Sequence, residues 1–148
     1  MKNKIRPTDI LIVEDNSFEA SLCQEALQQT DMPNTVHVVD SGEKALDYIY
    51  GRSPYKDAKR PDMILLDLNL PKMSGLDVLR QIKDDPKVAD IPVIVLSASD
   101  SERDIARSYA FHANSYVVKP LDFHKFAEVV RNIQEFWFQI AQVPMIRK

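Results

Sequence analysis

The chain has 148 residues, of which 45% are hydrophobic and 28% are charged, and its formal net charge at pH 7 is −3. These values are typical of one globular domain with a substantial core. The slightly acidic balance gives no sign of the basic surface that nucleic-acid-binding proteins usually carry, and no apolar run approaches the ~20 residues that span a bilayer.

The N-terminus and the cysteine content indicate a cytoplasmic protein. Residues 1–7 are polar and basic and lack the apolar core of a secretory signal. The single cysteine, Cys23, excludes an internal disulfide and suits a reducing compartment. Because Cys23 lies among helix-forming residues, we expect a buried structural thiol.

Five short apolar or β-branched runs predict strands, and a segment with helical spacing of apolar residues follows each of them. The expected strands are residues 10–13, 35–39, 63–66, 92–96 and 116–118. The expected helices are residues 16–27, 41–49, 74–83, 101–110 and about 122–140. The segment before the third strand, residues 51–61, contains a glycine, two prolines and several charges, and therefore predicts a long loop.

Three of these helices begin with a polar residue that an acidic residue follows three positions later. The pairs are Asn16 with Glu19, Ser74 with Asp77, and Ser101 with Asp104. This spacing is typical of a capping box, in which the first side chain accepts a hydrogen bond from the backbone and the second turns back to the first residue.

The fivefold alternation of strand and helix predicts βαβ units with right-handed crossovers and a parallel sheet covered on both faces. The continuous apolar run of residues 63–66 supports this, since parallel strands are buried on both sides. Only 29 residues follow Lys119, and one helix with a short tail accounts for them. We therefore expect one domain and no attached output domain.

Polar side chains follow four of the five predicted strands. The first strand ends at Glu14 and Asp15, the third at Asp67, the fourth at Ser97 and the fifth at Lys119. Taken singly, each has a simpler explanation as a turn residue, a helix cap or a surface lysine. Because the carboxyl ends of parallel strands meet at one edge of a sheet, their joint occurrence favours a common site.

The chemistry of this set indicates phosphoryl transfer. Three carboxylates at close range repel one another, and a divalent cation relieves the repulsion. Oxygen ligands that leave room for water and phosphate suit Mg²⁺. A carboxylate such as Asp67 can also act as a nucleophile and form an aspartyl phosphate. The Lys119 ammonium and the Ser97 hydroxyl would then complement the phosphoryl oxygens.

At these residues the chain resembles the receiver domain of two-component response regulators, over about residues 8–140. The motifs that carry the resemblance are residues 13–16, 65–71 with 74–75, 95–98 and 116–120. The resemblance implies an α/β fold of the flavodoxin-like (βα)5 type, a doubly wound parallel sheet with strand order 2-1-3-4-5. Residues 1–7 and 141–148 would be terminal extensions.

The resemblance also implies a role for each carboxylate. Asp67 would be the phosphoacceptor that a sensor histidine kinase charges. Asp15, Asp67 and the backbone carbonyl of Asn69 would bind Mg²⁺ directly, and Glu14 would act through water.

The remaining motif residues would read out the phosphoryl group. Ser97 and Lys119 would bind its oxygens, with the small Ala98 beside the pocket. Movement of the Ser97 hydroxyl would be coupled to inward rotation of Tyr116, which reshapes the surface of the fourth helix, fifth strand and last helix. The resemblance further implies a cis peptide bond before Pro120.

Two features refine the resemblance. The long loop, the length of the chain and the tail residues 135–138 with Val143 and Pro144 are similar to the small stand-alone regulators that partner bacterial phytochrome kinases. His112 stands where many receivers have glycine at a helix end, so a left-handed backbone there would carry a small strain.

The last predicted helix carries three consecutive aromatic residues, Phe136, Trp137 and Phe138. In an α-helix Phe136 and Phe138 lie about 100° on either side of Trp137, so the three rings cannot all face the sheet. We interpret them as an interface with a second copy or another partner, since exposed apolar patches usually mark interfaces. The alternative is a broad amphipathic face with one exposed ring.

The sequence therefore predicts a single-domain response regulator, a phosphorylation-gated switch in signal transduction, with no turnover activity. One alternative is a phosphotransfer intermediate of a phosphorelay, or a phosphate sink, with the same chemistry and no output surface. A phosphohydrolase of the haloacid-dehalogenase type is a second alternative. It needs an acid–base carboxylate two residues after the nucleophile, where this chain has Asn69.

Overall fold

The computed structural model of the chain describes residues 7–30 and 32–140. Its strands are β1 (Thr8–Val13), β2 (Asn34–Val39), β3 (Met63–Leu66), β4 (Val93–Ser97) and β5 (Ser115–Val118). Its α-helices are α1 (Ser17–Gln28), α2 (Gly42–Ile49), α3 (Gly75–Asp84), α4 (Glu102–Ala110) and α5 (Phe123–Glu135), and a π-helix, η1 (Phe136–Ile140), follows α5.

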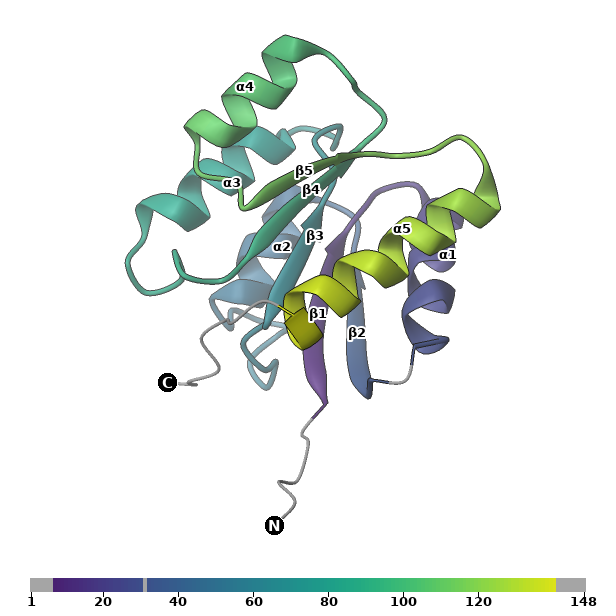
Figure 1. The fold of residues 1–148 in the computed structure, drawn as a ribbon. Coiled ribbons are helices and arrows are strands. Elements are labelled where there is room, and N and C mark those ends of the chain that lie inside the picture. Colours follow the sequence, from purple (N-terminus) through teal and green to yellow (C-terminus); the bar gives the residue numbers. More distant parts are fainter. Residues whose placement is uncertain (1–6, 31, 141–148) are drawn as a thin grey trace.

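All neighbouring strands pair in parallel, and the sheet order is β2-β1-β3-β4-β5. The predicted fold class and strand order are therefore confirmed. Figure 1 shows α1 and α5 on one face of the sheet and α2 and α3 on the other, with α4 next to β5.

The two faces of the sheet bury separate apolar clusters, because successive side chains of a strand point to opposite sides. In β1, Leu11 and Val13 pack with residues of α2 and α3, whereas Ile10 and Ile12 pack with residues of α1 and α5. The central strand β3 is buried throughout, as its apolar run predicted. Cys23 is buried in the second cluster, and burial raises the pKa of its thiol to about 12. The thiol therefore stays protonated at neutral pH, which suits a structural role.

Hydrogen bonds between strands continue for one residue past their carboxyl ends. The N–H of Glu14 donates to the Val39 carbonyl at 3.0 Å, and that of Asp67 donates to the Val13 carbonyl at 3.1 Å. The N–H of Lys119 donates to the carbonyl of Ser97 at 2.8 Å. The residues that follow the strands are thus fixed by the sheet itself and do not lie on independent loops.

Side-chain caps begin every α-helix, which satisfies backbone donors that the helix leaves unpaired. The caps are Asn16, Ser41, Ser74, Ser101 and Asp122, each accepting from the backbone N–H three residues later. The three caps predicted from the sequence are among them.

Two backbone expectations had different outcomes. His112 has a φ of 70°, so its backbone is left-handed and the condition for a small strain at this position is met. The prediction of a cis peptide bond before Pro120 is wrong, since in the described part of the chain the cis peptide bond is Ser53–Pro54. The two isomers of an X–Pro bond differ by only about 0.5–1 kcal/mol, so the local sequence does not decide between them.

The last helix was expected to remain regular to about residue 140, but it changes to a π-helix at Phe136. The wider turn of a π-helix reduces the angle between successive side chains. As a result the adjacent residues Trp137 and Phe138 both pack against the α1–α5 cluster. The tail residues Val143 and Pro144 and the extensions 1–6 and 141–148 lie outside the described residues.

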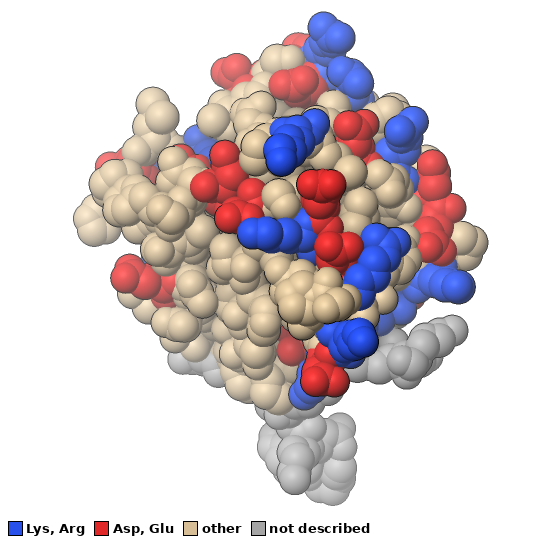
Figure 2. Space-filling view, turned by 180° about the vertical axis from the view of Figure 1, so that it is seen from behind, with Lys and Arg blue, Asp and Glu red and all other residues tan. Residues whose placement is uncertain are grey.

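The surface carries charges of both signs. Figure 2 shows the face opposite to that of Figure 1, and on it lysine and arginine side chains alternate with aspartate and glutamate. Among the described residues drawn on this face there is no continuous basic area. None of the described helices is long and apolar enough to cross a membrane.

Gly75 is a position where the fold directly constrains the residue after β3. A Cβ atom there would lie 2.2 Å from the carbonyl oxygen of Asp67 and 2.6 Å from Cα of Leu68. We expect Gly75→Ala to lower the free energy of unfolding by about 1–3 kcal/mol, towards the upper end because the obstructing atoms are backbone. Urea denaturation followed by circular dichroism measures the difference.

The matched control is Gly42→Ala. The Cβ of this variant would meet Val78 Cγ2 at 2.7 Å and the flexible side chain of Met73 beyond it. Side chains can shift where backbone cannot, so the loss should be smaller than at Gly75. Equal losses for the two variants would contradict this explanation.

Candidate functional site

The ammonium group of Lys119 lies at the centre of a cluster of carboxylates at the carboxyl edge of the sheet. Lys119 Nζ donates to Glu14 Oε1 at 2.6 Å, to Glu19 Oε1 at 2.5 Å and to Asp67 Oδ2 at 3.1 Å. The side chains of Lys119 and Asp67 are each only 8% exposed, and that of Glu14 is 6% exposed. The three predicted residues, which directly follow β1, β3 and β5, are therefore brought together.

The second oxygen of each buried carboxylate is held by its own loop. Glu14 Oε2 accepts from the backbone N–H of Asn16 at 3.1 Å. Asp67 Oδ1 accepts in the same way from Asn69 at 3.1 Å. Each carboxylate thus has one oxygen on Lys119 and the other on the backbone, which fixes its orientation.

Burial and the close approach of like charges change the proton affinities of the cluster. Burial raises the pKa of Glu14 from its ordinary 4.5 to about 7; the hydrogen bond from Lys119 opposes the rise and the charge of Asp67 adds to it. Burial alone would lower the pKa of Lys119, but its hydrogen bonds to Glu14 and Glu19 outweigh that and raise the pKa. The lysine is therefore a permanent cation here.

The oxygens of Glu14, Glu19 and Asp67 are arranged so that they can share one metal ion. One ligand atom from each lies within 4.8 Å of the others. Carboxylate oxygens in this number fit the hard divalent cations, which complete their coordination with water. The donor set present here is therefore compatible with a divalent metal.

The spacing of Glu19 predicts only the partner of a helix cap, and no sequence signal places its carboxylate in the cluster. Two of the residues predicted to bind the metal, Asp15 and Asn69, are exposed; Asp15 directly follows Glu14, and Asn69 lies two residues after Asp67. Asp15 lines an open pocket together with Glu14, so its carboxylate is accessible from solvent.

The residues expected to read out a phosphoryl group occupy the neighbouring strands. Ser97 is completely buried, and its hydroxyl accepts from the N–H of Ser99 at 3.2 Å. The hydroxyl of Tyr116 donates to the carbonyl of Ser99 at 2.8 Å. Ala98 is exposed and lines a pocket of about 230 Å³ together with Lys119. The loop after β4 therefore connects Ser97 with Tyr116.

The three aromatic residues at the chain's last helix do not share one environment. Phe136 is 48% exposed and stands edge-on to Trp137, with 5.6 Å between ring centroids. Trp137 and Phe138 are partly buried against the α1–α5 cluster. Of the three predicted interface residues, Phe136 is thus the most exposed to solvent.

The fold and the site together define a receiver domain. A family model described as the response regulator receiver domain matches residues 10–131, and the chain belongs to this family.

Several relatives are similar over nearly the whole chain. Response regulator Rcp1 of Synechocystis is 36% identical over 138 residues, which cover 93% of this chain and 94% of Rcp1. The probable methanogenesis regulatory protein FilR2 of Methanothrix harundinacea is 40% identical over 136 residues, which cover 88% of this chain and 84% of FilR2.

Solved structures of response regulators are also similar to this chain over nearly its whole length. The crystal structure of the phosphorylated cyanobacterial phytochrome response regulator RcpA has a TM-score of 0.91 and 43% sequence identity, covering 94% of this chain and 99% of RcpA. The Mn²⁺-bound form of Rcp1 has a TM-score of 0.88 and 36% identity, covering 93% of this chain and 99% of Rcp1.

The raised pKa of Glu14 makes the stability of the metal-free protein depend on pH. Between pH 4.5 and about 7 the folded state keeps a proton that the unfolded state has lost, so this stabilising contribution disappears as the pH rises through 7. We expect the thermal midpoint in the presence of a chelator to fall between about pH 5 and pH 7.5, and to fall less in Glu14→Gln. Calorimetry across this range measures it.

Glu25→Gln is the control, since Glu25 is an exposed carboxylate of the same charge on α1. Its profile should follow that of the wild type. A Glu14→Gln profile that also runs parallel to the wild type would show that Glu14 titrates normally.

Proposed function

We propose that Asp67 accepts a phosphoryl group from a sensor histidine kinase in a Mg²⁺-dependent reaction, and that the chain works as a phosphorylation-gated switch. The observation that carries this proposal is the hydrogen bond of 3.1 Å between Lys119 and Asp67 inside a cluster of carboxylates. The proposal is also supported by RcpA, whose crystal structure is of the phosphorylated form.

In the transfer step a carboxylate oxygen of Asp67 forms a bond to phosphorus. The bond between phosphorus and the imidazole nitrogen of the donor breaks, and that nitrogen keeps the electron pair. The chain contributes mainly position and charge, since phosphoryl transfer needs little other chemistry from the protein. Lys119 and the Ser97 hydroxyl would bind two of the phosphoryl oxygens.

A metal would be bound directly by Asp15, Asp67 and the backbone carbonyl of Asn69, and Glu14 would act through a water molecule. When bound, Mg²⁺ would neutralise charge that develops on the phosphoryl oxygens. The proposal for a metal is supported by the cluster of three carboxylates and by Rcp1, which has been crystallised with Mn²⁺.

The proposed switch connects Ser97 with Tyr116 through the loop after β4. In the present state Tyr116 is tied to the Ser99 carbonyl, two residues from Ser97. A shift of the Ser97 hydroxyl towards a phosphoryl group would therefore strain or release this contact. Because a phosphoryl group changes the equilibrium only through its different affinity for the two states, this contact is where the difference would arise.

The proposal that a kinase docks on this chain is supported by exposed apolar side chains beside the site. Phe18, Leu121 and Phe123 are 55%, 97% and 59% exposed, and Phe18 packs edge-on against Phe123 with 5.2 Å between ring centroids. A donor histidine has to reach Asp67 past this rim, so the patch suits a docking protein. The similarity to RcpA, a phytochrome response regulator, favours a kinase of the phytochrome type.

Phosphorylation of Asp67 can be tested by intact mass after incubation with Mg²⁺ and a small-molecule phosphodonor. We expect a gain of one phosphoryl group that is lost with a chelator and in Asp67→Asn, since amide nitrogen and oxygen are poor nucleophiles compared with a carboxylate.

The matched control is Asp40→Asn. Asp40 directly follows β2 at the same edge of the sheet but is bound to Lys44 and lies outside the cluster. The Asp40→Asn variant should gain one phosphoryl group, as the wild type does. A mass gain that persists in Asp67→Asn would place the acceptor elsewhere.

We further propose that the aromatic residues Phe136, Trp137 and Phe138 form an interface with a second copy of the chain. The exposed ring of Phe136 supports this. We expect Phe136→Ser to weaken self-association about tenfold or more, as the loss of an aromatic anchor does in other interfaces. Sedimentation velocity over a concentration series, with and without phosphodonor, measures it.

Phe18→Ser is the control, because Phe18 is an equally exposed phenylalanine at the start of α1. If both substitutions weaken association alike, or neither does, the interface does not involve the last helix.

A further inference from the structure

Glu19 does not complete the capping box that its position predicts. The side chain of Asn16 accepts from the N–H of Glu19 at 2.9 Å, which is the first half of the motif. In the second half the Glu19 carboxylate should accept from the N–H of Asn16. Glu14 occupies that N–H instead, at 3.1 Å. The Glu19 carboxylate is thereby left to bind Lys119.

This contact uses the last hydrogen of the ammonium group. Lysine has three N–H donors, and in Lys119 they go to Glu14, Glu19 and Asp67. A phosphoryl oxygen on Asp67 can therefore gain an N–H from Lys119 only if one of these carboxylates gives it up.

Glu19 is the carboxylate best placed to leave. Its side chain is 38% exposed, compared with 6% for Glu14 and 8% for Asp67. It has solvent to move into, because Glu19 and Lys119 line the same pocket beside Leu22 and Leu121. Glu14, by contrast, is held at its other oxygen by the backbone.

We propose that Glu19 is a positioning residue that holds Lys119 in the unphosphorylated state and competes with a phosphoryl-type anion for the same N–H. This inference rests on the proposed function. Its consequence is that Glu19 weakens anion binding at the site, although it lies on α1 and takes no part in the transfer itself.

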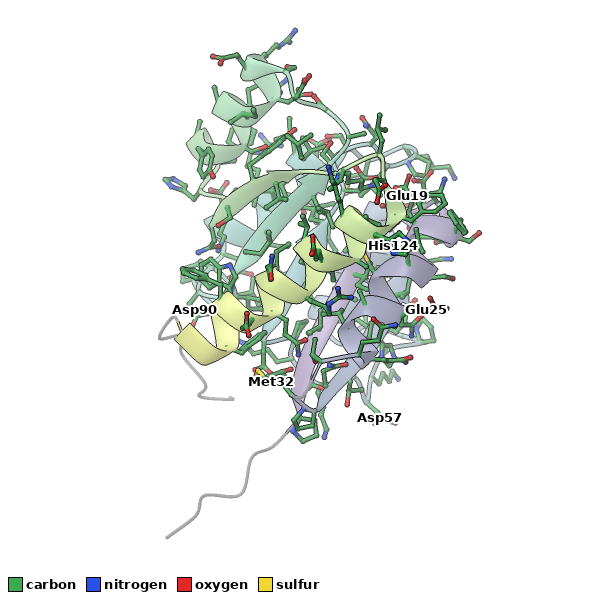
Figure 3. All side chains as sticks on the ribbon, turned by 45° about the vertical axis from the view of Figure 1, so that its right-hand side comes forward. Glu19, Glu25, Met32, Asp57, Asp90 and His124 are labelled. Atoms are coloured by element: carbon green, nitrogen blue, oxygen red, sulfur yellow. The ribbon has the colours of Figure 1, made fainter. Side chains whose placement is uncertain are left out.

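Glu25 offers a control on the same helix. Figure 3 shows Glu19, which lies in the first turn of α1, beside the start of α5, and Glu25 further along α1. The offset of six residues from Glu19 to Glu25 corresponds to about 9 Å along the helix axis. Glu25 is exposed and forms no hydrogen bond to Lys119, so Glu25→Gln makes the same change of charge without the contact.

The test is calorimetric titration of the Mg²⁺-loaded protein with beryllium trifluoride, which imitates a phosphoryl group on a carboxylate. A neutral amide holds an ammonium group less strongly than a carboxylate does, so Glu19→Gln should lower Kd by about three- to tenfold. Glu25→Gln should stay within about twofold of the wild type.

Glu19→Asp separates the contact from the charge. It keeps the carboxylate but shortens the side chain by about 1.5 Å, the length of one C–C bond. If the contact matters, Glu19→Asp also lowers Kd. A general loss of stability would instead weaken the binding of the anion and also the binding of Mg²⁺, measured in a separate titration. Competition by Glu19 predicts tighter binding of the anion with no gain in affinity for Mg²⁺.

Three results would overturn the inference while leaving the proposed function intact, provided that the wild type binds the anion. The first is an unchanged or higher Kd in Glu19→Gln. The second is a wild-type Kd in Glu19→Asp, which would show that the negative charge at position 19 affects anion binding and that its contact with Lys119 does not. The third is an equal gain in Glu25→Gln. Absence of binding to the wild type would contradict the proposed function, and the inference would fall with it.

Discussion

The structure of the functional edge depends on the compensation of charge around Lys119. Its ammonium group connects residues 105, 100 and 52 positions away in the sequence, which lie just after β1, in α1 and just after β3. A buried cation without partners, or buried carboxylates without a cation, would cost several kcal/mol each. Neither half of the cluster is stable without the other, so the contact that gives the site its chemistry also joins the ends of three strands.

Much of this arrangement could be predicted from the sequence because the signals are local. The apolar run of residues 63–66 and the repeated strand–helix pattern specify a parallel sheet, and the side-chain caps mark the helix starts. Once the sheet is parallel, residues that follow its strands must meet at one edge. Glu14, Asp67 and Lys119 were identified on this ground, and the structure brings them into direct contact.

The features that the sequence did not reveal depend on competition between partners. Glu19 has a complete local explanation as a capping residue, and only the position of Glu14 in the folded chain shows that the backbone donor is already taken. The isomer of the bond before Pro120 depends on a free-energy difference of about 0.5–1 kcal/mol, which tertiary contacts decide. The π-helix at Phe136 lets two adjacent side chains, Trp137 and Phe138, both pack against the core, and this packing depends on tertiary structure that the local sequence does not show.

The way the donors are occupied bears on how such a site can switch. In the present state all three donors of Lys119 have partners, and the hydroxyl of Tyr116 is bound to Ser99. Binding of a phosphoryl group therefore exchanges existing hydrogen bonds for new ones. An exchange of this kind changes the free energy by much less than the strength of any single bond, because the gain and the loss largely cancel. A small difference between two satisfied states keeps both accessible, and that is the physical condition for a signal that can be reversed.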